Sequence, residues 1–324
     1  MVYDNIIVDV SNLFYRLKKN SKTSIDIIKK INNYIGELQA NIHPDGSFYF
    51  LFDPISYSDL NEAKNFHYPL NERKKILPDY KANRVYSELF LETIELFRKY
   101  YLYRGEKFKL IYSDEYEADD FIEPLLKRLQ EKSIALITTD YDFARYISDN
   151  PVIHMVNKGI DQPFTKDEFE KLFQFKPTNA SVIMYKSLFG DKSDNILGAL
   201  YLKKVKFNTN IKMLCRNYLQ EVSDNNMTID DAVQQLKNAT IYSVTNKKEN
   251  KTAFDELFLV LSIVNLKISI LDKIYSNVNI IKSMLADKDI EPYIHCNPEN
   301  ATINDVIHKS IYGIPFRSSF GKVI

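Results

Sequence analysis

Glycine is scarce in this chain of 324 residues, which contains only eight. None of them falls in the G-x-G-x-x-G or G-x-x-x-x-G-K-[ST] spacing with which glycine-rich loops surround phosphate groups. The sequence therefore argues against dinucleotide-binding proteins and P-loop NTPases.

Cysteine and histidine are also rare. Cys215 and Cys296 are too few for a disulfide framework or a cysteine-rich zinc site, and they suit a reducing compartment. The five histidines lie too far apart for an H-E-x-x-H motif. Asp4 and Asp9 interrupt the apolar start of the chain, so neither a secretory segment nor a membrane span is expected. We expect a cytoplasmic protein, in the host cytoplasm if a phage encodes it.

The chain also has no net charge, since 43 Lys and Arg balance 43 Asp and Glu. No global field attracts the protein to nucleic acid or membrane, and any electrostatic partner must be inferred from local charge segregation. Apolar residues make up 45% of the chain and charged residues 27%, which is typical of soluble globular proteins, and the length suggests about two domains.

Short apolar runs alternate with helical patterns in the first half, which predicts βαβ units and a mostly parallel sheet. The expected strands are Ile6–Val10, Phe48–Phe52, Phe108–Tyr112, Ile134–Thr138 and Val152–Val156. The expected helices are Ser24–Gln39, Tyr86–Tyr101, Ala118–Gln130, Tyr141–Ser148, one opened by the capping box Thr165–Glu168, Asn179–Phe189, Ile211–Gln220 and Phe254–Ile270. Strand signals fade after Pro177, so we place an α/β domain at 1–176 and a helical domain at 177–324.

Acidic residues stand at the ends of the predicted strands. Asp9, Asp53 and Asp140 each close a strand, and Asp142 follows two residues after Asp140. Ligand sites in open parallel sheets form beyond the carboxyl ends of the strands, so these side chains are expected to lie together. Any one of them alone is more simply explained as a helix cap or a turn residue, and it is their combination that indicates a site.

Two further acidic segments complete the pattern, Glu117 to Asp120 and Asp191 to Asp194. The nine candidate metal ligands are Asp9, Asp53, Glu117, Asp119, Asp120, Asp140, Asp142, Asp191 and Asp194. Converging carboxylates repel one another unless cations neutralise them, and all-oxygen ligands suit Mg²⁺ or Mn²⁺. Two such ions can clamp the attacking and leaving oxygens in phosphodiester cleavage, so we predict a two-metal nuclease.

Basic residues are concentrated in two segments. The first, between residues 71 and 84, contains Arg73, Lys74, Lys75, Lys81 and Arg84. The second, between residues 201 and 216, contains Lys203, Lys204, Lys206, Lys212 and Arg216. Beside a carboxylate pocket these segments predict nucleic-acid binding through phosphates, although a solvated helix face would explain either one alone. Tyr80 is a candidate stacking platform for an unpaired base, with packing as the alternative.

In this order and spacing, the motifs resemble those of the flap endonuclease and 5′→3′ exonuclease family, particularly its bacteriophage ribonuclease H-type replication nucleases. The matching segments are Asp9, Asp53, Tyr80-Lys-Ala-Asn-Arg84, Glu117-Ala-Asp-Asp120, Asp140-Tyr-Asp142 and Gly190-Asp-Lys-Ser-Asp-Asn195. The resemblance implies a PIN-like three-layer α/β/α domain, with a helical arch near 60–84 and a C-terminal helical DNA-binding domain.

The resemblance also implies roles for single residues. Glu117, Asp119, Asp120 and Asp140 would bind the first of two Mg²⁺ ions, with Asp9 and Asp53 nearby through water, and Asp142, Asp191 and Asp194 would bind the second. Mn²⁺ would substitute for Mg²⁺. Lys81 and Arg84 would stabilise charge on the scissile phosphate, and Asp140 would take part in catalysis.

One departure from the family concerns its helix-three-turn-helix, which is degenerate here. Only Gly198 is present where the family has two glycines, so the backbone nest and monovalent-cation site lack one of their glycines. Lys203, Lys204 and Lys206 are candidates for an electrostatic substitute.

The implied function is a 5′ nuclease of replication intermediates, including RNA-primer removal, and the implied partners are DNA and RNA–DNA hybrids with 5′ ends or flaps. A catalytically inactive nucleic-acid-binding scaffold, a small PIN-type ribonuclease and a phosphatase are the alternatives. We expect a monomer. The tail Gly313–Arg317 is a candidate contact for a clamp or single-strand-binding protein, although packing is the favoured role.

Overall fold

The computed structural model describes residues 2–42, 46–54, 66–67, 72–102, 104, 107–112, 116–130, 132–147, 152–155, 158, 162–201, 209–236 and 272–282. Its centre is a five-stranded sheet with the strand order β5-β2-β1-β6-β7. The strands are β1 (Asn5–Asp9), β2 (Ser47–Leu51), β5 (Phe108–Ile111), β6 (Ile134–Thr138) and β7 (Val152–Met155). All neighbours pair in parallel, so the predicted strands and the parallel sheet are confirmed.

The central strands are buried along their whole length. Every residue of β1 and of β6 is buried, and Ile6 of β1 pairs with Phe48 of β2 on one side and with Ala135 of β6 on the other. A strand covered on both faces needs a continuous apolar run, which is the pattern that predicted it.

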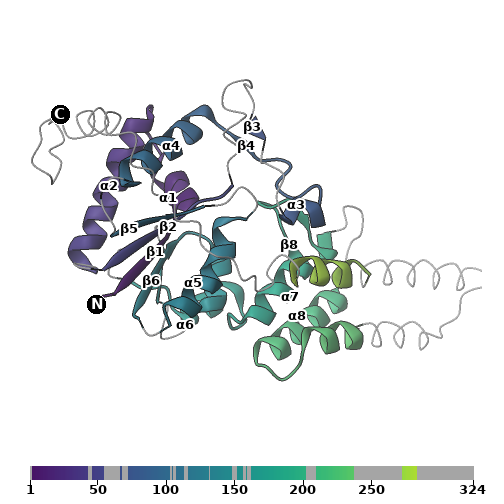
Figure 1. The fold of residues 1–324 in the computed structure, drawn as a ribbon. Helices are drawn as coiled ribbons and strands as arrows, with labels where there is room; N and C mark the ends of the chain where they lie inside the picture. Colours follow the sequence, from purple (N-terminus) through teal and green to yellow (C-terminus); the bar gives the residue numbers. More distant parts are fainter. Residues whose placement is uncertain are drawn as a thin grey trace, which may run out of the picture.

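Helices cover both faces of this sheet and give the expected three layers (Figure 1). The helices α2 (Ser24–Asn41) and α4 (Glu88–Leu102) pack together on one face, and α5 (Ile122–Arg128) and α6 (Lys166–Phe173) lie on the other. The predicted capping box at Thr165 is present at the start of α6.

The short helix α1 (Val10–Leu17) was not predicted. It follows β1 without a linker, because Asp9 ends the strand and its side chain caps the helix by accepting a hydrogen bond from the Asn12 amide. The apolar run of the strand continues into Val10, which hides the beginning of a two-turn helix.

Two predicted helical segments are wound more tightly than expected. The segment 118–130 begins as the 3₁₀ helix η2 (Ala118–Phe121) before α5, and the segment 141–148 forms only the six-residue 3₁₀ helix η3 (Tyr141–Tyr146). Both begin at acidic cap residues, Glu117 and Asp140. Short 3₁₀ turns of this kind are common at the ends of strands and helices.

The second half is helical where it is described. It contains α7 (Asn179–Phe189), a short antiparallel hairpin of β8 (Gly190–Asp191) and β9 (Ile196–Leu197), the 3₁₀ helix η4 (Ala199–Tyr201), α8 (Thr209–Ser223) and helices at 229–236 and 272–282. The predicted helix Phe254–Ile270 and the tail segment 313–317 lie outside the described residues. Within the described part of the chain, none of the helices has the length and apolar character needed to span a membrane.

The remaining elements connect β2 to α4. They are β3 (Phe66–His67), α3 (Glu72–Ile76) and β4 (Val85–Tyr86), and β3 pairs with β4 in an antiparallel hairpin. Much of the predicted arch, at 60–65 and 68–71, lies outside the described residues.

Candidate active site

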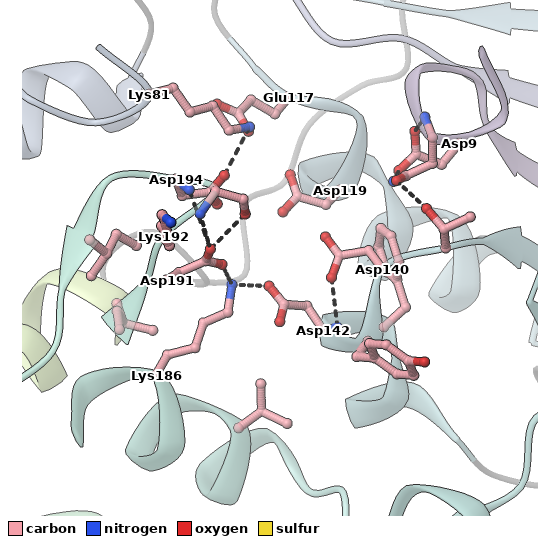
Figure 2. A pocket seen from close by; sticks show the side chains of 18 of the residues that line it. Asp9, Lys81, Glu117, Asp119, Asp140, Asp142, Lys186, Asp191, Lys192 and Asp194 are labelled. Carbon is pink, nitrogen blue, oxygen red and sulfur yellow. Dashed lines mark hydrogen bonds and ion pairs between the residues drawn. The ribbon is translucent and has the colours of Figure 1, made fainter. Parts of the chain in front are cut away.

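A cavity of about 480 Å³ opens beyond the carboxyl ends of β1, β2 and β6. Eight of the nine predicted metal ligands line it: Asp9, Asp53, Glu117, Asp119, Asp140, Asp142, Asp191 and Asp194. In Figure 2 the side chains of Asp119, Asp140, Asp142 and Asp191 face a common space. The topology explains the position, since the chain leaves β1 towards β2 but returns from β5 to β6 on the other side of β1.

The acids at the strand ends are anchored by backbone amides. Asp9 is buried and accepts a hydrogen bond from the Asn12 amide over 3.1 Å, and Asp140 accepts one from the Asp142 amide over 2.9 Å. Asp53 accepts a 3.3 Å hydrogen bond from the Ala118 amide, which ties the end of β2 to the start of η2. These bonds fix where the carboxylates point.

Arg73 lies inside the acidic cluster rather than on its surface. Its guanidinium is buried and donates to Glu117 over 2.9 Å, to Asp119 over 2.5 Å and to Asp120 over 3.2 Å. Asp120 is the one predicted ligand that does not line the cavity, and its carboxylate accepts a hydrogen bond from the Glu117 amide in a capping box. We expected Arg73 on the surface, where it would bind substrate phosphates. In this structure its guanidinium is instead buried, because it binds three carboxylates.

Tyr80 and Lys81 converge on the same carboxylate. The Tyr80 hydroxyl donates to Glu117 over 3.0 Å, and the Lys81 ammonium lies 2.5 Å from the same oxygen. The Tyr80 ring is fully buried, so in this structure it packs and does not offer a face for base stacking. Lys74 and Lys75 lie on α3, half-buried and exposed respectively.

Lys81 and Arg84 do not lie on a helix. Helix α3 ends at Ile76, before Pro78, and residues 78–83 form turns in which Lys81 has a φ of 48°. The described residues therefore form turns, and not a helical arch, around Lys81 and Arg84. Pro78 disfavours helical backbone at the residue before it, which ends α3.

The turn that contains Lys81 is bonded to the loop after β8. The Lys81 amide donates to the Asp194 carbonyl over 3.0 Å, and the Arg84 guanidinium donates to the Asp194 carboxylate over 3.1 Å. Asn195 donates to the Asp79 carbonyl over 2.8 Å. Basic and acidic motifs more than 100 residues apart thereby form one wall of the cavity.

Asp191 is positioned by its own turn. Its carboxylate accepts hydrogen bonds from the Ser193 amide over 2.8 Å and from the Ser193 hydroxyl over 2.6 Å. Gly190, which precedes it, has a φ of 76° and lies against Gly198, where any added Cβ would approach backbone atoms at 2.3 Å. The close contact of these two glycines brings β8 and β9 together under the site.

Lys186 is a site residue that sequence reasoning missed. Its ammonium forms ion pairs with Asp142 and, over 2.7 Å, with Asp191, and only 12% of its side chain is exposed (Figure 2). A single lysine in a predicted helix is normally solvent-exposed. The available signal was its position one turn before the Gly190–Asp191 motif. This places Lys186 in the last turn of α7, next to Asp191.

Burial and mutual repulsion shift the ionisation of these acids. Burial, reinforced by the neighbouring Asp53, raises the pKa of Asp9 to about 7. Burial and the adjacent Asp142 raise the pKa of Asp140 well above its usual range. At Asp191, burial alone would raise the pKa, but the Lys186 ammonium and the Ser193 hydrogen bonds outweigh it and lower the value to about 2.

The composition of the cavity fits hard divalent cations. Eight acidic side chains line the cavity with five basic ones, Arg73, Lys81, Arg84, Lys186 and Lys192, so acids outnumber bases by three. All of the acidic ligands offer oxygen atoms, as Mg²⁺ and Mn²⁺ require. In the described residues, no three acids or histidines are close enough to form a single metal-binding group, and the cations Arg73, Lys81 and Lys186 lie between the carboxylates instead.

The remaining predicted residues, Lys203, Lys204 and Lys206, lie outside the described residues. Their place relative to the cavity stays a prediction.

Sequence comparison finds that the chain is similar to a DNA polymerase I and to a 5′-3′ exonuclease. It is 31% identical over 148 residues to DNA polymerase I of Streptococcus pneumoniae R6, a match that covers 44% of this chain and 16% of the polymerase. It is 30% identical over 130 residues to the 5′-3′ exonuclease of Aquifex aeolicus, covering 39% of this chain and 43% of that protein. The chain thus spans less than half the length of these relatives.

Solved structures share the fold of this chain. The T5 D15 protein co-crystallised with metal ions has a TM-score of 0.53 at 16% identity, covering 95% of this chain and 94% of that one. The catalytic core of Rad2 in complex with DNA substrate has a TM-score of 0.51 at 17% identity, covering 97% of this chain and 89% of that one. At these identities the likeness concerns the fold.

A family match covers the sheet and most of the acidic motifs. Residues 5–174, more than half of the chain, match the N-terminal resolvase-like domain of 5′-3′ exonucleases. The matched region contains β1 to β7 and seven of the nine predicted ligands, from Asp9 to Asp142. The chain therefore belongs to the 5′-3′ exonuclease family.

Proposed function

We propose that this chain is a divalent-metal-dependent 5′ nuclease that cleaves phosphodiester bonds in replication intermediates by a two-metal mechanism. The observation that carries the proposal is the convergence of carboxylates from five separate segments on one cavity at the carboxyl end of a parallel sheet. Such a concentration of buried negative charge is costly unless cations are bound there in the working enzyme.

The acidic residues divide into two sets. Glu117, Asp119 and Asp140 would hold one Mg²⁺, with Asp9 and Asp53 nearby through water, and Asp142, Asp191 and Asp194 would hold the other. Asp120, predicted as a further ligand, pairs with Arg73 and does not line the cavity. When bound, the two ions would supply Lewis-acid stabilisation of the negative charge in an in-line displacement at phosphorus.

The basic side chains of the cavity would orient the substrate. Arg84 is the most exposed of the three that pair with Glu117 or Asp194, with 29% of its side chain exposed, and its fork matches phosphate geometry. Lys81 is buried beside Glu117 and would add positive charge next to the scissile phosphate. Both would exchange a carboxylate partner for a phosphate oxygen as the substrate enters.

The proposed substrates are DNA and RNA–DNA hybrids with free 5′ ends or flaps, including RNA primers. Two observations on similar proteins support them: the A. aeolicus relative is a 5′-3′ exonuclease, and the Rad2 core was solved with DNA substrate. A cavity that carries net negative charge needs bound cations before it can accept a phosphodiester, which is consistent with a strict metal requirement.

Cleavage assays test this function directly. A 5′-flap duplex, a nicked duplex and an RNA primer on DNA, each labelled on the strand to be cut, are incubated with Mg²⁺, with Mn²⁺ and with EDTA. We expect cleavage with either metal, 5′-phosphate products and no cleavage in EDTA. Tight binding without cleavage under every metal condition would favour the inactive scaffold, and cleavage that persists in EDTA would rule out the metal mechanism.

A further inference from the structure

The ammonium of Lys186 bridges two carboxylates that come from different parts of the chain. Asp142 belongs to η3, beyond β6, and Asp191 belongs to β8, 49 residues later. Lys186 reaches both from α7, lies 2.7 Å from the Asp191 oxygen and is bonded to Asp142. Its own side chain is nearly buried, so water screens these ion pairs little.

The same ammonium also interacts with acids that it does not contact. Burial alone would lower the pKa of Lys186, but the charges of Asp142, Asp191, Asp194 and Asp140 outweigh it and raise the pKa well above its usual value. These four carboxylates include all three that the proposed function assigns to the second metal. Figure 2 shows the Lys186 ammonium between Asp142 and Asp191, at the edge of the common space.

We propose that Lys186 is a built-in counter-ion of the second metal site. It offsets part of the negative charge of Asp142 and Asp191 in the metal-free protein and withdraws from between them when a divalent cation binds there. The inference rests on the proposed function for the identity of the site. Its physical basis is that an ammonium and a divalent cation bound to the same two carboxylates would repel each other at a few ångström in a poorly hydrated cavity.

The chemistry of lysine suits a reversible role. Its ammonium is a single point charge on a flexible four-carbon stem, so it can swing away and keep contact with a neighbouring acid. Arg73 at the first acidic cluster is different, because its planar fork is held by Glu117, Asp119 and Asp120 together. We therefore infer that the second site, rather than the first, gives up its internal cation readily.

Lys186 should therefore stabilise the metal-free protein and weaken the binding of the second metal ion. Without Lys186, Asp142 and Asp191 would repel each other in the absence of metal, and an incoming divalent cation would meet no competing charge. Lys186→Met keeps much of the stem and removes the ammonium. Lys176→Met is the matched control, because Lys176 pairs with Asp224 on the surface, with 53% of its side chain exposed, and does not line the cavity.

The experiment measures Mn²⁺ binding by electron paramagnetic resonance and thermal unfolding in EDTA, both without substrate. For Lys186→Met we expect the weaker Mn²⁺ to bind at least about tenfold tighter than in the wild-type protein. We also expect a lower Tm in EDTA and a larger rise in Tm on adding Mn²⁺. Lys176→Met should leave the Mn²⁺ affinities unchanged.

A second variant keeps the test decisive if Lys186→Met fails to fold. Lys186→Arg retains the charge and can bind both carboxylates with its fork, so the weaker Mn²⁺ should bind more weakly than in the wild-type protein. Unchanged or weaker Mn²⁺ binding in folded Lys186→Met, or tighter binding in Lys186→Arg, would overturn the counter-ion role even in an active nuclease. A protein that shows the expected affinity shifts but cleaves no substrate would instead overturn the proposed function, and absence of Mn²⁺ binding in every variant would overturn both.

Discussion

At the scale of single residues, the site is an alternation of acids and bases. Glu117 is paired with Arg73 and Lys81, Asp194 with Arg84, and Asp191 with Lys186. Asp140 differs, since its carboxylate accepts the Asp142 amide and its pKa is raised by burial and by the Asp142 charge. A carboxylate that is buried next to another carboxylate lowers the free energy of unfolding, and catalytic residues commonly have this cost.

Asp140→Asn tests this residue. The amide oxygen can still accept the Asp142 hydrogen bond, but the charge is lost. We expect the single-turnover cleavage rate to fall by at least about 100-fold while DNA binding, measured by fluorescence anisotropy without Mg²⁺, stays within a few-fold.

The same variant should be more stable than the wild-type protein in EDTA. Because the folded-state pKa of Asp140 is raised, its ionisation destabilises the fold progressively as the pH rises above the ordinary Asp value, and Asn removes that loss at pH 7. Asp26→Asn, at an exposed acid in the first turn of α2, is the control for the loss of one charge. Wild-type turnover in Asp140→Asn would remove this residue from the chemistry.

Cys215 provides a prediction about reactivity. Its thiol is buried on α8, and burial raises its pKa to about 12. The thiol is thus protonated at pH 8, and only the thiolate is a strong nucleophile. We expect mass spectrometry after iodoacetamide treatment at pH 8 to find Cys215 unmodified in the native protein and alkylated after unfolding. Rapid alkylation in the native state would mean that α8 opens readily.

At the scale of elements, the β8–β9 hairpin sets the position of Asp191. Gly190 needs its positive φ, and Gly198 lies so close to it that an added Cβ at Gly198 would approach the Gly190 nitrogen at 2.2 Å. Gly198 was noticed in the sequence as the single glycine of a degenerate DNA-binding motif. In the structure it has a second use, as the residue that lets β9 approach the end of α7.

Gly198→Ala should therefore disturb the site through the backbone. We expect a loss of about 1–3 kcal/mol in the free energy of unfolding, measured by urea denaturation, together with weaker Mn²⁺ binding as Asp191 shifts. Gly36→Ala is the matched control: Gly36 lies in α2 with nothing within 4 Å of an added Cβ, so alanine should be neutral or stabilise by up to about 1 kcal/mol. Equal effects of the two substitutions would contradict the close approach.

At the scale of the whole molecule, the cavity depends on segments from both halves of the chain. Its lining runs from Asp9 at the end of the first strand to Ile281 in the helix 272–282. Asn277 of that helix is buried and donates to the Ser187 carbonyl over 2.9 Å and to the Leu197 carbonyl over 2.8 Å. The side-chain amide of Asn277 thus connects the last turn of α7 to β9, on either side of the β8–β9 turn.

Asn277→Ala tests this long-range support. Two carbonyl groups would lose a donor in the interior, which costs about 1–3 kcal/mol for each buried group left unsatisfied. We expect a lower Tm and reduced cleavage, although residue 277 lies 83 residues beyond the last predicted metal ligand, Asp194. Asn226→Ala, which removes an exposed pair with Glu221, should change neither quantity. Full cleavage by Asn277→Ala would show that the hairpin holds its position without this helix.

The order of residues along the chain was sufficient to predict the sheet and the convergence of its acids. Strands buried on both faces need unbroken apolar runs, and parallel strands necessarily present their carboxyl ends on one side, so Asp9, Asp53 and Asp140 could be placed together. The division near residue 176 stays a prediction.

The pairing of charges could not be derived in this way. Arg73 and Tyr80 belong to a segment whose composition predicts an exposed basic surface, and Lys186 belongs to a predicted helix. Neither periodicity nor local spacing distinguishes a polar side chain turned outward from one turned inward. Their direction depends on which carboxylates the fold brings within a few ångström from segments 44, 37 and 44 residues away. The strength of electrostatic attraction depends on how far apart two groups lie in space, and not on their separation along the chain. Only the packed tertiary structure sets those distances.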